Sequence, residues 1–288
     1  MRDVSDTALW VATFRAQETA RRDALFRDPL AAALVGEEGP RLVRSLGYAG
    51  RFSGGVIVRT VAFDDFIRSS IALRGVGAIV NLGAGLDTRP YRMDLPAGLR
   101  WWEVDLPRLL DFKEARLEGQ VPRCDLRRLR VDLRDPRARR AMLREIEGAC
   151  AAERKRALIV TEGVLPYLAP YDAATLAREI AERPSFAFWA ADLVAETMPA
   201  FSGRRKFGKA LEKAGAPFRF APKEGVRFFE AFGFRVIEQR NPIFEAYRLH
   251  RVPWFMRPLK PLTALPPREG THRASWAKAG SVLLERRP

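Results

Sequence analysis

The sequence predicts an α/β fold in which a mainly parallel, seven-stranded sheet follows a helical N-terminal segment. Short apolar runs alternate with longer amphipathic stretches from about residue 76 onward, which is the rhythm of βαβ units. A pair of glycines directly follows the first apolar run, as expected where a strand gives way to a helix. We therefore expect a helical segment over residues 1–75 and one sheet-containing core over residues 76–288.

The N-terminal segment contains three stretches with helical periodicity. Residues 5–20 carry apolar side chains at helical spacing behind a Ser/Asp cap, and a second helix is expected after Asp28 and Pro29. A third helix is expected over residues 56–73, ending at Gly75.

Seven strands are expected in the rest of the chain. They are residues 78–82, 100–105, 126–132, 157–162, 186–192, 234–240 and 280–286. Helical stretches over residues 107–117 and 171–183 lie between strands, and a helix is expected over residues 228–232, directly before the sixth strand. We also expect a helical insertion near residues 196–222 and a Pro-rich loop near residues 251–271.

The net charge of +15 is the unusual bulk property of this chain of 288 residues. It comes from 42 arginines and only 8 lysines, spread through every segment. The densest basic stretch, residues 123–140, interleaves aspartates and has no aromatic side chains on which bases would stack. This pattern favours a solvated, Arg-rich surface over a nucleic-acid footprint, and the charge favours an anionic substrate.

Cysteine and histidine are scarce, with two of each. These numbers are too small for a disulfide framework or a Cys/His metal cluster, so we expect a reducing, cytoplasmic location and no metal. No run approaches the roughly 20 apolar residues that cross a bilayer, and no signal peptide is recognisable, so we expect no membrane partner.

The glycine pair, Gly83 and Gly85, lies in N-L-G-A-G-L-D-T-R. Glycines at such a position let the backbone approach a ligand, as in dinucleotide-binding loops with three glycines. Here Thr88 occupies the third position, so the dinucleotide pattern is incomplete. The pair alone is also compatible with an ordinary strand-to-helix turn.

Acidic residues close the next three expected strands. Asp105 ends the second strand about twenty residues beyond the glycines, Asp132 with Leu133 ends the third, and Glu162 ends the fourth. A single acid there is usually a helix cap or a solvated charge. Three beside a glycine loop favour a nucleoside-type site, in which an acid accepts hydrogen bonds from ribose hydroxyls.

The other end of the ligand separates two nucleoside cofactors. A dinucleotide presents pyrophosphate, which the missing third glycine disfavours, whereas S-adenosyl-L-methionine presents an amino-acid moiety and a sulfonium. Arg59, upstream of the loop, is a candidate for a bidentate pair with the methionine carboxylate. A solvated helix arginine remains the alternative from spacing alone.

At this point the sequence resembles the leucine carboxyl methyltransferase family, which includes tetracenomycin-type polyketide O-methyltransferases. The resemblance rests on V-R-T-V-A-F-D-D (58–65), N-L-G-A-G-L-D-T-R-P-Y-R (81–92), W-E-V-D-L-P (102–107) with Lys113, T-E-G-V-L-P-Y-L (161–168), and the N-terminal T-A-L-W-V-A-T-F-R-A-Q-E-T-A and F-R-D-P-L-A. It covers residues 5–170 closely and the C-terminal part loosely, where G-F-R-V replaces the usual Gly-Trp.

The resemblance implies a Rossmann-like class I methyltransferase fold, with the helical segment as a cap over an S-adenosyl-L-methionine site. It implies contacts from Arg59 to the carboxylate, Asp105 to the ribose and Asp132 with Leu133 on the adenine side, together with Gly83 and Glu162. Members methylate carboxyl groups, including the C-terminal leucine of a protein phosphatase, or hydroxyls of small natural products. The insertion and the Pro-rich loop are expected to shape the acceptor pocket.

Methyl transfer to oxygen is an in-line displacement that depends mainly on alignment. A carboxylate acceptor is already ionised at neutral pH, whereas a phenol benefits from a base. His250 is the candidate base and Tyr167 a candidate acceptor contact, and for each a structural role is the alternative. Arg248 and Arg251 are candidates for holding a substrate carboxylate. We assign no catalytic residue and expect a small, anionic acceptor; the oligomeric state does not follow from the sequence.

Three other functions compete. A nucleic-acid methyltransferase is suggested by the charge, but enzymes that methylate base amino groups usually carry Asn/Asp-Pro-Pro-aromatic after the fourth strand, where this chain has Glu162 and Gly163. A nicotinamide dehydrogenase is disfavoured by Thr88. A binding module without turnover is disfavoured by the complete set of acids together with Arg59.

Overall fold

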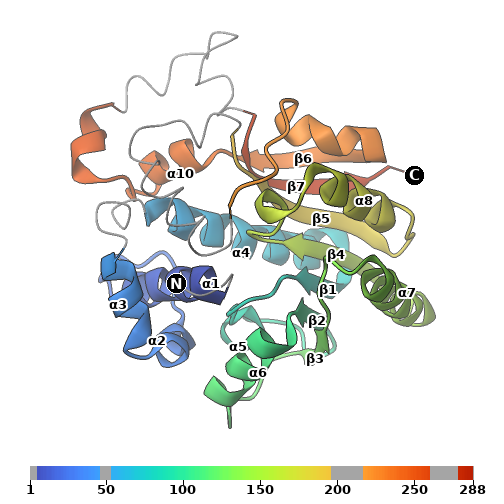
Figure 1. Cartoon of the computed structure of the whole chain (residues 1–288), viewed down its shortest axis with the longest axis horizontal. Coiled ribbons are helices and arrows are strands. Elements are labelled where there is room, and N and C mark those ends of the chain that lie inside the picture. Colours follow the sequence, from blue (N-terminus) through green and yellow to red (C-terminus); the bar gives the residue numbers. More distant parts are fainter. Residues whose placement is uncertain (1–4, 46–52, 196–216, 260–277, 288) are drawn as a thin grey trace.

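The computed structural model describes residues 5–45, 53–195, 217–259 and 278–287. Its centre is a seven-stranded sheet with the strand order β3-β2-β1-β4-β5-β7-β6 (Figure 1). The strands are β1 (Val76–Leu82), β2 (Arg100–Asp105), β3 (Asp125–Arg130), β4 (Arg156–Thr161), β5 (Phe186–Leu193), β6 (Phe234–Arg240) and β7 (Gly280–Arg286). Strands β1 to β5 are parallel, and β7 runs antiparallel to both β5 and β6. The predicted α/β fold class is confirmed.

Helices precede the sheet and cover it. They are α1 (Ser5–Thr19), α2 (Pro29–Val35), α3 (Glu38–Ser45), α4 (Gly54–Arg74), α5 (Arg89–Arg92), α6 (Pro107–Arg116), α7 (Pro136–Ala152), α8 (Pro170–Ala181) and α10 (Pro242–Arg248). The described part of the chain also contains the 3₁₀ helices η2 (Leu165–Tyr167), η4 (Gly225–Phe232) and η5 (Trp254–Leu259).

Alternation along the strands builds a core on each face of the sheet. In β1, Val80 points to the side covered by α7 and α8, while Ile79 points to the side covered by α4. On the α4 side, Phe63 and Phe66 are completely buried. Successive side chains of a strand point to opposite faces, so a strand buried on both sides reads as a continuous apolar run. Burial on both faces thus explains the largely apolar sequence A-I-V-N-L of β1.

The order in which strands are added to the sheet reverses at β1, because β2 and β3 follow on one side of it and β4 and β5 on the other. In open parallel sheets, ligands bind in the crevice at the carboxyl ends of the strands at such a switch point. Helices α1 and α2 lie near this edge (Figure 1). Leu9 of α1 and Leu34 of α2 share a buried cluster with Leu86 of the glycine loop and Leu109 of α6.

Several sequence expectations need correction. The third expected strand, 126–132, ends at Arg130, because the chain turns there and Asp135 N donates to Asp132 O at 3.0 Å. The helix expected around residues 228–232 is the 3₁₀ helix η4. Of the expected helical insertion, residues 196–216 lie outside the described residues, and 217–222 have no regular helix. Likewise, the described part of the Pro-rich loop contains η5, and its remainder lies outside.

Candidate functional site

The glycine loop follows β1 at the switch point. Gly83 N and Ala84 N donate to Val104 O of the neighbouring strand at 2.8 and 3.1 Å. Gly83 has φ of +70°, and a Cβ atom there would lie 2.4 Å from Val164 Cγ2. Both the backbone conformation and the close packing therefore require glycine at this position.

Asp105 lies at the end of β2, directly against this loop. Its Oδ2 accepts from Gly85 N at 2.6 Å and its Oδ1 from Leu106 N at 2.7 Å. Burial raises the pKa of the Asp105 carboxyl, against these hydrogen bonds, and the nearby charge of Asp132 raises it further. The spacing of twenty residues seen in the sequence thus becomes a direct contact between loop and carboxylate.

Asp132 and Leu133 lie in the turn after β3. The Asp132 carboxylate pairs with Arg134 at 2.8 Å, and this hydrogen bond holds the Asp132 pKa below its usual range. Leu133 O accepts from Arg139 Nη1 at 2.6 Å, and the buried Arg139 pairs in turn with Glu179 at 2.7 Å. The turn is therefore held to α7 and α8, beside Asp105.

Arg59 projects from α4 to the carboxyl ends of β4 and β5. Its Nε donates to Glu162 Oε1 at 3.0 Å, and its Nη1 donates to Asp192 Oδ2 at 3.3 Å. Burial alone would lower the Arg59 pKa, but the charges of Asp192 and Glu162 outweigh it and the pKa is raised. The guanidinium therefore stays charged in a largely buried position.

Six side chains form a line of alternating charge along this edge of the sheet, which we call the ion network. In order, its members are Arg92, Asp64, Arg89, Glu162, Arg59 and Asp192. The distances between successive charged groups are 2.7, 2.7, 2.8, 3.0 and 3.3 Å. Buried charges are tolerated when each is paired with an opposite charge, and every member of the network meets this condition.

A branch of the network reaches the glycine loop through Asp87. Arg89 Nη1 donates to Asp87 Oδ2 at 3.0 Å, and Asn81 Nδ2 donates to the same oxygen at 2.8 Å. Burial works to raise the Asp87 pKa, but the charges of Arg89 and Lys113 lower it well below its usual range. The loop, α4 and the turn after β4 are thus fixed to one another by charge.

The helical segment also contacts the loop. Arg15 Nη2 donates to Leu86 O at 2.5 Å, while its Nε pairs with Asp28 at 2.8 Å. A Cβ atom on Gly85 would lie 3.7 Å from Ala8 Cβ of α1. Helix α1 therefore packs against the glycine loop.

Sequence reasoning missed four network members, which are Asp64, Arg89, Arg92 and Asp192. For Asp192 a signal was present, because an acid at a strand end had already selected Asp105 and Glu162. Burial raises the Asp192 pKa, Arg59 opposes this, and Asp192 Oδ1 accepts from Gly163 N at 2.6 Å.

The two candidate acceptor-side residues lie in different surroundings. Tyr167 of η2 lies close enough to Arg59 and Asp192 for their charges to act on its hydroxyl, and burial raises its pKa to about 12. Its ring centroid is 5.5 Å from that of Phe218. His250 is exposed on the turn after α10, with φ of +55°, and its imidazole makes no hydrogen bond within the described part of the chain.

Two arginines considered as holders of a substrate carboxylate already have protein partners. Arg248 pairs with Glu245 at 2.5 Å, and the buried Arg251 pairs with Glu18 at 2.7 Å. Tyr167, rather than His250, is therefore close to the ion network, and neither arginine is left unpaired.

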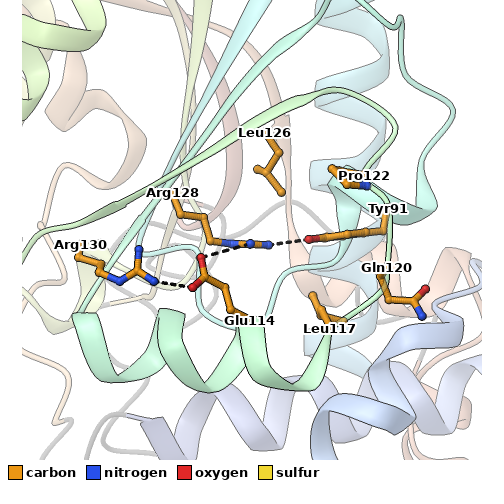
Figure 2. A pocket seen from close by; sticks show the side chains of 8 residues that line it. All are labelled: Tyr91, Glu114, Leu117, Gln120, Pro122, Leu126, Arg128 and Arg130. Atoms are coloured by element: carbon orange, nitrogen blue, oxygen red, sulfur yellow. Dashed lines mark hydrogen bonds and ion pairs between the residues drawn. The ribbon is translucent and has the colours of Figure 1, made fainter.

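A cavity of about 340 Å³ lies elsewhere, between β3, α6 and α5 (Figure 2). Arg128 donates to Tyr91 Oη at 2.7 Å across it, and Arg130 pairs with Glu114. None of the residues predicted to bind the cofactor lines this cavity. Its arginines are already paired, so we do not regard it as the cofactor site.

Within the described residues, no group of three or more His, Cys, Asp or Glu side chains has an arrangement that would hold a metal ion. No helix among them is both long and apolar enough to cross a membrane.

Curated relatives are similar to this chain in sequence. Candidate S-adenosyl-L-methionine-dependent methyltransferases of Mycobacteroides abscessus and Rhodococcus jostii are 39% and 40% identical over 186 and 183 residues. The matched parts cover 59% and 58% of this chain and 58% of each relative, so the chain spans 58% of their length.

Two solved structures have the same fold. A candidate methyltransferase of Thermobifida fusca superimposes with a TM-score of 0.55 at 16% identity, covering 90% of this chain and 93% of that one. A DUF574 family protein of Streptomyces avermitilis gives 0.54 at 12% identity, covering 96% and 97%. The model of the leucine carboxyl methyltransferase family matches residues 8–181, which is more than half of the chain. The protein therefore belongs to the leucine carboxyl methyltransferase family.

Proposed function

We propose that the protein is an S-adenosyl-L-methionine-dependent O-methyltransferase acting on a carboxylate, or a hydroxyl, of a small molecule. The proposal rests on the different charged groups that lie on the two sides of the glycine loop. Asp105 lies on one side of the glycine loop, and Arg59 with Glu162 lies on the other. This arrangement suits a ligand with ribose hydroxyls at one end and an amino acid at the other. Family membership and the names of the relatives support it.

In this proposal, Asp105 holds the ribose and Arg59 holds the methionine carboxylate. Asp132 and Leu133 border the adenine, and Gly83, Gly85 and Glu162 complete the pocket. The bound cofactor supplies an electrophilic methyl group on its sulfonium. The residues of the chain contribute by binding and orienting both reactants, which can account for about 7–11 kcal/mol of a barrier.

A carboxylate is the acceptor that we favour over a hydroxyl. A tyrosine whose pKa is about 12 keeps its proton at neutral pH, so Tyr167 is unsuited to act as a base. His250 is exposed and has no partner to orient it within the described residues. A carboxylate needs neither residue, because it is already ionised. A cytoplasmic location is part of the proposal and agrees with Cys124 and Cys150, which are buried free thiols.

Nothing observed favours the nucleic-acid alternative. The dense basic stretch, residues 123–140, is largely engaged with acids of the protein itself. The arginines in these pairs are Arg128, Arg130, Arg134, Arg139 and Arg140. Paired arginines are poor phosphate ligands, since each would have to exchange its carboxylate. Filter binding with tRNA or DNA at two salt concentrations would reveal a nucleic-acid partner as strong, salt-sensitive retention.

The proposal is tested by transfer of a labelled methyl group from S-adenosyl-L-methionine to a panel of carboxylic acids and phenols. Calorimetric titration of S-adenosylhomocysteine tests the cofactor site without knowledge of the acceptor. A folded protein that does not bind S-adenosylhomocysteine would refute the proposal.

Replacing Asp105 by alanine is expected to weaken binding of S-adenosylhomocysteine about ten- to a hundredfold, since one charge-assisted hydrogen bond is worth about 1.5–3 kcal/mol. Binding of 5′-methylthioadenosine should weaken by the same factor, because this compound keeps the ribose. The matched control is Asp111→Ala, an exposed carboxylate on α6 that should leave both affinities unchanged. Equal affinities in folded Asp105→Ala and wild type would remove Asp105 from the site.

The pH dependence separates the two acceptor chemistries. A carboxylic acid has a pKa near 4, so for a carboxylate acceptor the single-turnover rate should be nearly flat from about pH 6 to 9. His250→Ala should then cost little. A phenol acceptor predicts a rate that rises with pH, and a loss of about 10²–10⁴-fold in His250→Ala if His250 is the base. Single-turnover rates are needed because slow product release would flatten either profile.

A further inference from the structure

We infer that Asp192 is a positioning residue for the amino-acid end of the cofactor, acting through Arg59. The inference rests on the proposed function and adds a residue that neither the sequence motifs nor the family match includes. Asp192 lies beyond residue 181, where the match to the family model ends. It occupies the carboxyl end of β5, next to β4 in the sheet.

Asp192 contacts Arg59 directly. Asp192 Oδ2 accepts from Arg59 Nη1 at 3.3 Å, while Glu162 Oε1 accepts from Arg59 Nε at 3.0 Å. A guanidinium presents its donors in one rigid plane, so two anchors on different nitrogens fix both the direction and the rotation of that plane. Nη2 makes no hydrogen bond within the described residues and remains as a donor for a carboxylate.

Asp192 also contacts the turn after β4. Asp192 Oδ1 accepts from Gly163 N at 2.6 Å. Gly163 has φ of +67°, and a Cβ there would lie 3.3 Å from Arg59 Nη1, so the turn passes close beneath the guanidinium. One carboxylate therefore holds both the arginine and the turn that carries Glu162, in a place where it is itself buried.

The geometry gives Asp192 a role that a merely structural acid would not have. If Asp192 orients Arg59, its loss should affect ligands that carry a carboxylate and spare those that lack one. Asparagine is the sharpest substitution, because its carbonyl can still accept from Gly163 N. Its amide would then turn donors toward Arg59 Nη1, and two donors cannot pair.

The experiment compares S-adenosylhomocysteine with 5′-methylthioadenosine, which lacks the carboxylate, by titration calorimetry. Asp192→Asn is expected to weaken S-adenosylhomocysteine about tenfold, the lower range for one charge-assisted hydrogen bond, and to leave 5′-methylthioadenosine unchanged. In an Arg59→Ala background the same substitution should cause no further loss of affinity, because its route of action through Arg59 is gone. Glu182→Gln, which neutralises an exposed carboxylate, is the matched control.

If Asp192→Asn weakens the binding of both ligands equally, the inference is wrong and Asp192 is purely structural. Tighter binding of S-adenosylhomocysteine would also overturn the inference, because it would show that Asp192 competes with the ligand for Arg59. If Asp192→Asn does not fold, Asp192→Ser is smaller, can still accept from Gly163 N, and should give the same selective loss. Wild type that binds neither ligand would refute the proposed function itself. Wild type that prefers S-adenosylhomocysteine, beside an unaffected Asp192→Asn, would refute the inference alone.

Discussion

Replacing Arg89 by methionine is expected to lower the free energy of unfolding by about 3–5 kcal/mol, the usual cost of removing one partner from a buried ion pair. Arg89 is buried and lies within 3.0 Å of three carboxylates, Asp64, Asp87 and Glu162. Its loss would leave these acids close together in a poorly hydrated place, with fewer positive charges to balance them. Urea unfolding followed by circular dichroism measures the change.

The matched control is Arg68→Met, because Arg68 also contacts Asp64, at 3.8 Å, but is half exposed on α4. Exposed pairs contribute at most about 1 kcal/mol, so this variant should stay close to wild type. Arg89→Lys should recover only part of the loss, since an ammonium cannot reach three carboxylates with a planar set of donors. Similar losses in Arg89→Met and Arg68→Met would show that the ion network does not stabilise the fold.

Arg59→Ala is expected to weaken the binding of S-adenosylhomocysteine by about a hundredfold to several thousandfold. This corresponds to about 3–5 kcal/mol, the cost of leaving a buried charge unpaired. The ligand carboxylate would then face Glu162 and Asp192 without the cation that separates them. Binding of 5′-methylthioadenosine should change little. Calorimetric titration of both ligands measures the difference, and Arg59→Lys should rescue only part of it.

If Arg59→Ala weakens both ligands equally while the protein remains folded, the pairing with the methionine carboxylate is wrong. The role of Arg59 would then be to hold the carboxyl ends of β4 and β5 together. Asp105→Ala distinguishes the two ends of the ligand, because it should weaken both compounds and Arg59→Ala only one.

Local signals predicted the helices and strands whose ends depend on local chemistry. Asp28 caps α2 by accepting from Ala31 N at 3.2 Å, and Gly75 ends α4 in the left-handed region, with φ of +64°. Helix α3 was not predicted, because Gly39 and Pro40 resemble a helix break. Proline is nevertheless tolerated in the first turn, where its missing N–H would have no partner.

The contact between Gly85 and Asp105 was within reach of the sequence, because adjacent parallel strands bring their carboxyl ends to one edge. The ion network was not. Arg59 and Asp192 form a hydrogen bond although they are 133 residues apart in the sequence. Nothing in the neighbouring sequence distinguishes a buried arginine from the other arginines among the 42. Such pairs are decided by how α4 packs on the sheet, which periodicity alone does not specify.

The position of β7 between β5 and β6 has a consequence for biosynthesis. Every residue of β5 is buried, yet one of its edges pairs only with β7, the last of the seven strands to be translated. Until Gly280–Arg286 is synthesised, the backbone N–H and C=O groups along this edge of β5 have no partner strand. An exposed apolar edge of this kind promotes pairing between chains. Closure of the sheet depends on contacts far apart in sequence and is therefore expected to be slow. Nascent chains that stall before residue 280 should be the aggregation-prone species in the life of this protein.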